Sequence, residues 1–302
     1  MTTLPVSVII PAFNRAALLG RALESVAAQR PALPAEVIVV DDHSDDDTAA
    51  VARAHGATVI RHDRNRGAAA ARNTALEAAR QPWIAPLDSD DEWLPHHLAT
   101  LWALRAGHVL VAGAAMQLGD HGSGGLLHGP DRDRIVRYGD PERILAPYNP
   151  IPASAVLVQR DAVLAAGGYD TGLRYAEDWD LWIRVLERGT AIQSPQVITR
   201  YHRHPGQKTA SHDGPARAQR TIVDRYRSRP WCGDRAVARR HAAVAWDGLR
   251  RSIRERRLTD VLAGAREIAS PRVAYEVGAL IAHRRRLRHR SAAIAPEDVH
   301  LG

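Results

Sequence analysis

The sequence predicts an α/β protein in which a Rossmann-like, mostly parallel sheet is flanked by helices. Two observations lead to this fold class. Over residues 1–115, short apolar runs alternate with segments whose apolar residues recur at helical spacing. Acidic residues directly follow two of the apolar runs, as Asp41-Asp42 and as Asp88-Ser89-Asp90-Asp91. Strands that alternate with helices form parallel sheets, which bind ligands at the carboxyl ends of their strands. We therefore expect both acidic groups at one ligand-binding edge.

Each element of this first part is predicted from its own pattern. Continuous apolar runs predict buried strands, and apolar residues three or four positions apart predict helices that cover the sheet. The expected strands are 6–11, 37–40, 58–61, 83–87 and 109–112, and the expected helices are 16–29, 46–54, 68–79 and 95–105.

The second part of the chain is less regular. Residues 117–150 are rich in glycine, proline and charge, and we expect a loop excursion there. A strand at 151–160, a helix at 178–188 and a strand at 197–204 are expected to follow. From residue 215 the pattern is helical, with breaks near 228–234 and at 270–271. We therefore predict an α/β domain over residues 1–214 and a basic, mostly helical C-terminal extension over 215–302.

Composition excludes several classes of protein. The 302 residues are 45% hydrophobic and 25% charged, as in ordinary globular proteins. The single cysteine, Cys232, excludes an intrachain disulfide and a cysteine-based zinc site. The apolar stretch from Val109 to Met116 is far too short to span a bilayer, and the N-terminus does not have the pattern of a signal peptide. We expect a cytoplasmic protein.

The formal net charge of +7 is concentrated in arginines of the last third, ending in the run from Arg284 to Arg290. Lys208 is the only lysine, so the preference for arginine extends over the whole chain. A solvated helix face explains the run, and peripheral contact with the anionic inner face of a membrane is the alternative. We expect no nucleic-acid partner.

The turn after residue 87 carries the strongest chemical signal. Asp88, Asp90 and Asp91 lie within four residues, and crowded carboxylates repel one another unless a cation neutralises them. Oxygen ligands suit a hard divalent ion such as Mg²⁺ or Mn²⁺. An acidic turn that caps the following helix is the alternative, although one acid would suffice for that.

Six segments, taken in order, resemble the family 2 glycosyltransferases with the GT-A fold. The resemblance covers residues 5–205, and one departure is His43, where the family usually has glycine. The segments are Val8-Ile9-Ile10-Pro11-Ala12-Phe13-Asn14-Arg15, Val39-Val40-Asp41-Asp42-His43-Ser44-Asp45-Asp46, Asn65-Arg66-Gly67 with Ala71-Arg72-Asn73, Leu87-Asp88-Ser89-Asp90-Asp91-Glu92-Trp93-Leu94-Pro95, Gly167-Gly168-Tyr169-Asp170 and Glu177-Asp178-Trp179-Asp180-Leu181-Trp182.

The resemblance implies a metal-dependent, inverting enzyme that uses a nucleotide-activated sugar, most readily a UDP-sugar. It implies an acceptor hydroxyl on a glycan, a lipid-linked sugar or a small molecule. The implied donor-binding residues are Pro11, Ala12, Phe13, Asp42, Arg72, Asp88 and Asp90. Capping of the next helix is the alternative role for Asp42, and a salt bridge to the acidic turn is the alternative for Arg72.

The implied metal ligands are Asp90, Asp91 and His204, with Mn²⁺ or Mg²⁺ as the cofactor. A metal that bridges diphosphate oxygens stabilises the charge that develops as the glycosidic bond breaks. For His204, membership of a basic surface loop is the alternative.

Asp178 is the implied general base. The acceptor hydroxyl loses its proton as it attacks the sugar, and a carboxylate within hydrogen-bond reach can take that proton. Direct displacement then inverts the anomeric centre. The alternative is an acid at a helix N-terminus that interacts with the helix dipole.

Other functional classes fit less well. A receiver domain needs a lysine near its fifth strand, and Lys208 lies outside that region. A dinucleotide-binding dehydrogenase needs Gly-x-Gly-x-x-Gly after the first strand, where this chain has Pro11-Ala12-Phe13-Asn14-Arg15-Ala16. A catalytically inactive nucleotide-sugar-binding protein with the same fold remains the alternative function.

Overall fold

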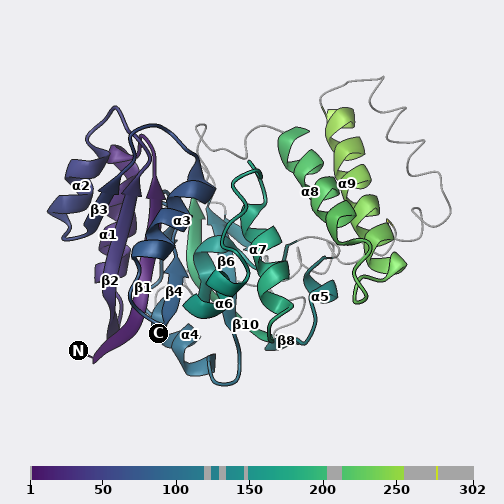
Figure 1. Ribbon diagram of the computed structural model, residues 1–302, viewed down its shortest axis with the longest axis horizontal. Helices are drawn as coiled ribbons and strands as arrows, with labels where there is room; N and C mark the ends of the chain where they lie inside the picture. Colours follow the sequence, from purple (N-terminus) through teal and green to yellow (C-terminus); the bar gives the residue numbers. More distant parts are fainter. Residues whose placement is uncertain are drawn as a thin grey trace.

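The computed structural model describes residues 2–118, 124–128, 134–145, 149–202, 213–254 and 277. Strands and helices alternate through the first part, as the sequence predicts (Figure 1). The elements here are β1 Thr2–Ala12, α1 Ala16–Ala27, β2 Ala32–Asp41, α2 Thr48–Ala54, β3 Thr58–Arg61, α3 Ala68–Ala78, β4 Trp83–Pro86, β5 Glu92–Trp93 and α4 His97–Leu104.

The remaining described elements confirm the predicted helix near residue 178 and the final strand, which is longer than expected. They are β6 Leu110–Leu118, β7 Gly124–His128, β8 Val136–Tyr138, α5 Glu142–Leu145, the 3₁₀ turn η1 Ala153–Ala155, β9 Val156–Gln159, α6 Arg160–Ala165, α7 Glu177–Leu186, β10 Ala191–His202, α8 Asp213–Tyr226 and α9 Asp234–Arg254.

The prediction of a plain loop over 117–150 was wrong. This segment contains β7, which pairs with β6, and β8, which pairs with β10. Strands of three to five residues are too short to display the alternation that marks a strand in sequence. The predicted strand at 151–160 was only partly right, because it begins as the turn η1 before β9.

The sheet has the strand order β3-β2-β1-β4-β9-β6-β10-β5. The pairs β1·β2, β2·β3, β1·β4 and β6·β10 are parallel, whereas β9 runs antiparallel between β4 and β6. The sheet is therefore mixed but mostly parallel, and the carboxyl ends of β1, β2 and β4 share one edge.

Both faces of the sheet are covered. In β1, Ile9 packs in one apolar cluster with residues of α3 and α7, whereas Val8 and Ile10 pack in a second cluster with residues of α1 and α4. Successive side chains of a strand point to opposite faces, so a continuous apolar run buries residues on both.

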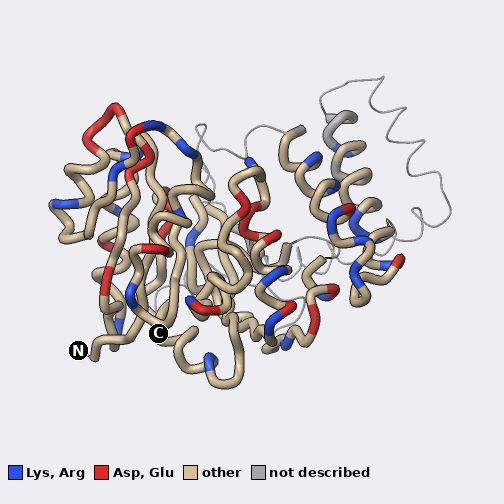
Figure 2. The backbone as a smooth tube through the Cα atoms, viewed as in Figure 1, with Lys and Arg blue, Asp and Glu red and all other residues tan. Residues whose placement is uncertain are grey.

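Helices α8 and α9 pack beside α7 (Figure 1). Ile222 and Tyr226 of α8 and Val237 of α9 belong to the same apolar cluster as residues of the sheet. Basic residues recur along these two helices, as Figure 2 shows. The division at residue 214 stays a prediction, although the helices that follow it share a core with the preceding domain.

No helix among the described residues combines the length and the apolar character that crossing a bilayer requires. The arginine run from Arg284 to Arg290 lies outside the described residues.

Candidate functional site

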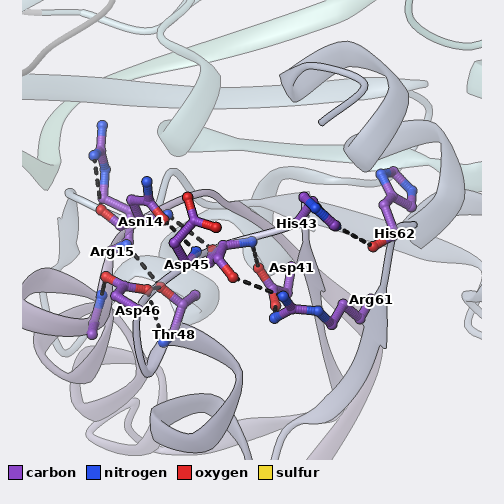
Figure 3. Close-up of polar contacts among 11 residues, drawn as sticks. Asn14, Arg15, Asp41, His43, Asp45, Asp46, Thr48, Arg61 and His62 are labelled. Carbon is purple, nitrogen blue, oxygen red and sulfur yellow. Dashed lines mark hydrogen bonds and ion pairs between the residues drawn. The ribbon is translucent and has the colours of Figure 1, made fainter. Parts of the chain in front are cut away.

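The loops that follow β1 and β2 are tied together by polar contacts (Figure 3). The Asn14 N–H donates to Ser44 Oγ at 2.9 Å, and the Asp45 N–H donates to Asn14 Oδ1 at 2.9 Å. Asp46 Oδ2 accepts a hydrogen bond from the Ala16 N–H at 3.0 Å. These bonds fix the two loops side by side at the carboxyl edge of the sheet.

Pro11, Ala12 and Phe13 lie where β1 enters this edge. Pro11 and Ala12 are buried and pair with Val40 and Asp41 of β2. Phe13 is 41% exposed. The role of these three residues in nucleotide binding stays a prediction.

The turn after β2 contains His43, at the position where the resembled family usually has glycine. His43 has a φ of +69°, a left-handed conformation that glycine adopts readily and histidine adopts at a cost. The turn is held by the buried Asp41, whose carboxylate accepts the Ser44 N–H at 2.9 Å and pairs with Arg61 at 2.5 Å. His43 therefore retains the backbone shape of the glycine that it replaces.

Asp42 is buried and already holds three partners. Its Oδ1 lies 2.6 Å from His62 Nδ1 and accepts the Arg66 N–H at 2.9 Å, and its Oδ2 accepts the Gly67 N–H at 2.7 Å. These amides precede α3, so the carboxylate organises the start of that helix. A contact between Asp42 and a nucleobase stays a prediction, and it would have to use the remaining acceptor capacity of the carboxylate.

The acidic turn lies between β4 and β5. Asp90 Oδ2 lies 3.8 Å from Arg15 Nη2, and the Asp90 carbonyl accepts a hydrogen bond from Arg21 Nη2 at 3.1 Å. The Asp91 N–H donates to the Asp88 carbonyl at 3.0 Å and closes the turn. Asp88, Asp90 and Asp91 are thus brought together, and arginines of the β1–α1 segment contact the turn.

Asp91 is the most deeply buried acid of this turn, with 2% of its surface exposed. Its Oδ2 accepts a hydrogen bond from Ser154 Oγ at 2.6 Å, and no described group makes a hydrogen bond to its buried Oδ1. Burial, followed by the charges of Asp88 and Asp90, raises the pKa of Asp91 well above its usual value, although hydrogen bonds from Ser154 and from the His202 backbone to the carboxylate oppose this rise. A buried acid with an unpartnered oxygen beside two other acids fits a bound cation.

A complete metal site is not preformed in the part of the chain that the structure describes. No group of three or more His, Cys, Asp or Glu there is arranged to hold an ion. A cation beside Asp91 would therefore need oxygens from another source, such as a bound diphosphate or water. The predicted ligand His204 lies outside the described residues, and the nearby His202 contacts Glu92 Oε2 at 3.2 Å.

Arg72 joins the acidic turn to α7. This buried side chain donates from Nη2 to Asp88 Oδ1 at 2.5 Å and from Nη1 to Glu177 Oε1 at 3.0 Å. Although burial opposes its charge, Asp88 and Glu177 raise the pKa of Arg72 above its ordinary value. One guanidinium thus holds the acidic turn and the first residue of α7 within reach of each other.

The neighbouring Asn73 fixes the turn before α7. Its Oδ1 accepts the Tyr169 N–H and its Nδ2 donates to the Tyr169 carbonyl, both at 2.8 Å. Gly168 has a φ of +69°, and a Cβ there would lie 2.7 Å from Asn73 Oδ1. The Gly167-Gly168-Tyr169 segment is therefore shaped to receive Asn73, and the Tyr169 ring lies 5.4 Å from the Arg72 guanidinium.

Asp178 occupies the first turn of α7, next to Glu177. Its Oδ2 accepts a hydrogen bond from Asn149 Nδ2 at 3.2 Å. Burial raises the pKa of Asp178 to about 6, with further contributions from the charges of Glu177 and Asp88 and an opposing one from Arg72. Asp178 is therefore coupled electrostatically to the acidic turn, and its pKa lies near the range that suits a general base.

Asp180, two residues further along α7, has a structural role. Its buried carboxylate accepts hydrogen bonds from Arg184, from Arg225 at 2.9 Å and from the Tyr226 hydroxyl at 2.9 Å. These contacts join α7 to α8. The tryptophans of the same motif, Trp179 and Trp182, are buried in the core.

Ser154 is a site residue that sequence reasoning missed. It lies in η1, outside every segment of the resemblance, and its hydroxyl contacts the acidic turn at both Asp88 and Asp91. A single serine in an apolar stretch carries no local signal of such a contact. Only the return of β9 to the centre of the sheet brings it there.

Comparison with known proteins shows which family this chain resembles. The model of "Glycosyl transferase family 2" matches residues 7–120. Succinoglycan biosynthesis protein ExoU of Rhizobium meliloti is 34% identical over 207 residues, which cover 61% of this chain and 57% of ExoU. UDP-Glc:alpha-D-GlcNAc-diphosphoundecaprenol beta-1,3-glucosyltransferase WfaP of Escherichia coli is 28% identical over 214 residues, which cover 68% of this chain and 80% of WfaP.

A solved structure supports the fold. The crystal structure of S. aureus TarS 1-349 in complex with UDP-GlcNAc superposes with a TM-score of 0.62 and 19% identity, over 79% of this chain and 70% of that chain. The chain spans little more than half the length of ExoU, so the matches do not extend to that whole protein. Together with the order of the motifs, these matches show that the chain is similar to members of glycosyl transferase family 2 and has a GT-A fold like that of TarS.

Proposed function

We propose that this protein transfers a sugar from a UDP-sugar to an acceptor hydroxyl, with inversion, in the synthesis of a polysaccharide or another glycoconjugate. One observation carries the proposal: Arg72 contacts both Asp88 and Glu177, which brings the acidic turn and Asp178 to one place. A transferase needs this proximity, because donor and acceptor must meet at a single carbon atom. The names of WfaP and of the TarS complex, which include UDP-Glc and UDP-GlcNAc, support UDP as the carrier.

On the donor side, the exposed Phe13 ring offers an apolar surface to a nucleobase, with Pro11, Ala12 and Asp42 behind it. Asp88, at the adjacent edge, would accept hydrogen bonds from the ribose hydroxyls, and Asp90 would contact the diphosphate through the cation. Mn²⁺ or Mg²⁺ held by Asp91 and Asp90 would supply Lewis-acid stabilisation of the departing nucleotide. The unpartnered Oδ1 of Asp91 supports this assignment.

On the acceptor side, Asp178 takes the proton of the attacking hydroxyl. Its pKa of about 6 leaves it mostly ionised at neutral pH and still basic enough to accept a proton. The hydrogen bond from Asn149 to Oδ2 and one from the Trp179 backbone orient the carboxylate.

For the acceptor, the name of WfaP supports a sugar on a lipid diphosphate. Such an acceptor lies at a membrane surface, and the basic residues of α8 and α9 would favour contact with anionic headgroups. Sedimentation with anionic vesicles tests this contact, and equal sedimentation with and without them would refute it.

The test of the function compares two aspartates that occupy the same place in their helices. Asp178→Asn removes the proposed base, and Asp161→Asn removes an exposed acid from the first turn of α6. We expect Asp178→Asn to bind UDP with Mn²⁺ like the wild type but to release UDP from UDP-sugars about 10²- to 10⁴-fold more slowly, the size typical for loss of a general base. Asp161→Asn should behave as the wild type.

The wild type is assayed with UDP-glucose, UDP-galactose and UDP-N-acetylglucosamine. If it binds UDP but hydrolyses none of them, the chain is an inactive nucleotide-sugar-binding protein. If UDP affinity falls with Asp178→Asn, Asp178 belongs to the donor site instead.

A further inference from the structure

The Ser154 hydroxyl lies between the two ends of the acidic turn. It accepts a hydrogen bond from the Asp88 N–H at 3.1 Å and donates one to Asp91 Oδ2 at 2.6 Å. A hydroxyl has a single proton, and the Asp88 amide can only donate. When Asp91 is ionised, as a metal ligand must be, the proton of Ser154 points to Asp91 Oδ2.

Ser154 itself is held firmly. It is 3% exposed, and its carbonyl accepts hydrogen bonds from Trp93 Nε1 at 2.7 Å and from Thr199 Oγ1 at 3.0 Å. Trp93 belongs to β5 and Thr199 to β10, so two strands locate the backbone of η1. The position of the Ser154 hydroxyl relative to the acidic turn is therefore fixed by these two strands.

This arrangement determines how Asp91 presents its carboxylate. Ser154 engages Oδ2, whereas Oδ1 is left without a described hydrogen-bond partner. Without the hydroxyl, Asp91 could rotate and the amide of Asp88 would lose its acceptor.

We propose that Ser154 is a positioning residue of the transfer reaction, which sets the Asp88–Asp91 turn so that Asp91 Oδ1 faces the donor diphosphate and its cation. This inference rests on the proposed function. Partners that orient a metal ligand typically contribute 10- to 100-fold to metal affinity, and we expect an effect of this size on Mn²⁺-dependent binding of UDP.

The chain offers a matched control in Ser7. Its buried hydroxyl also donates to a carboxylate, Glu36 Oε1 at 2.5 Å, and also accepts a backbone N–H, that of Gln81 at 3.2 Å. Ser7 lies in β1 well before the carboxyl edge, away from the acidic turn. Ser7→Ala and Ser154→Ala therefore remove the same pair of bonds at two places.

UDP affinity is measured by calorimetry with Mn²⁺ for the wild type, Ser7→Ala, Ser154→Ala and Ser154→Thr, with thermal unfolding measured without nucleotide. We expect both alanine variants to lower Tm, but only Ser154→Ala to weaken UDP binding, by 10- to 100-fold. Ser154→Thr keeps the hydroxyl and should recover most of the affinity.

A double-variant cycle with Asp91→Asn asks whether Ser154 acts through Asp91. If it does, adding Ser154→Ala to Asp91→Asn causes little further loss of affinity. Equal UDP affinity of Ser154→Ala and Ser7→Ala, or fully additive losses in the cycle, would overturn the inference while leaving the proposed function intact. Absence of UDP binding by the wild type would instead overturn the proposed function, and the inference with it.

Discussion

Replacing Asp178 with asparagine should stabilise the protein at alkaline pH. Asp178 is an ionised acid in a place that disfavours its charge, since burial and then the charge of Glu177 raise its pKa from 3.8 to about 6. Asparagine has nearly the same shape, and its side-chain oxygen can still accept the hydrogen bond from Asn149. The substitution therefore removes the charge and little else.

The sign and size of the change in the free energy of unfolding follow from proton linkage. Because the folded state binds this proton more tightly, the stability that the group contributes is fully present below pH 3.8 and is lost as the pH rises through about 6. A shift of about two units corresponds to about 3 kcal/mol at most. About 2 kcal/mol of this falls between pH 4.5 and 8, and solvent screening of the partly exposed Asp178 lowers the expectation to about 1 to 2 kcal/mol.

The assay is urea unfolding of the wild type and of Asp178→Asn at pH 4.5 and pH 8. The advantage of the variant in free energy of unfolding should be about 1 to 2 kcal/mol larger at pH 8. Other titrating groups cancel in this comparison, and Asp161→Asn serves as a control for replacing an exposed aspartate in the first turn of a helix. An identical difference in stability at both pH values would refute the electrostatic account of Asp178.

Three further substitutions test the packing that assembles the site, each by urea unfolding. Arg72→Lys should destabilise by about 2 to 4 kcal/mol, because an ammonium cannot bridge both buried carboxylates; wild-type stability would contradict the bridge. Gly168→Ala should lower the free energy of unfolding clearly more than Gly56→Ala, since both glycines have positive φ but only at Gly168 does a Cβ meet a neighbour within 4 Å. Equal losses would count against the close packing of Asn73 on Gly168. His43→Gly should stabilise by up to about 1 kcal/mol, because relief of the left-handed backbone exceeds the added entropy of glycine, and a loss of stability would show that the histidine side chain matters more.

The alternation of apolar patterns predicted most of the first half of the fold. Continuous runs such as that of β1 are buried on both faces, so their assignment needs no knowledge of distant contacts. By contrast, β5 has two residues and β8 has three, and each is a strand only because β10 lies beside it. Elements of this length depend on tertiary pairing that no local pattern contains.

Sequence reasoning singled out the acids that the structure brings close together, but it did not predict the contacts that each of them makes. The positions of Asp42, Asp88 and Asp178 at strand and helix ends were readable from the pattern. That Asp42 binds the amides before α3, and that one serine spans the acidic turn, depends on segments that fold back from a distance. Such contacts are fixed by the topology of the sheet, which places β9 between β4 and β6.

We propose that the acidic turn holds the departing nucleotide next to the place where Asp178 receives the acceptor. A crystal structure of the protein soaked with UDP and Mn²⁺, with anomalous scattering used to locate manganese, tests it most directly. We expect an anomalous peak for manganese within bonding distance of the Asp91 carboxylate and the uracil ring packed against Phe13. We also expect the Asp178 carboxylate on the side of the diphosphate from which the acceptor would approach. Nucleotide bound away from the 88–91 turn, or separated from Asp178 by the sheet, would contradict it.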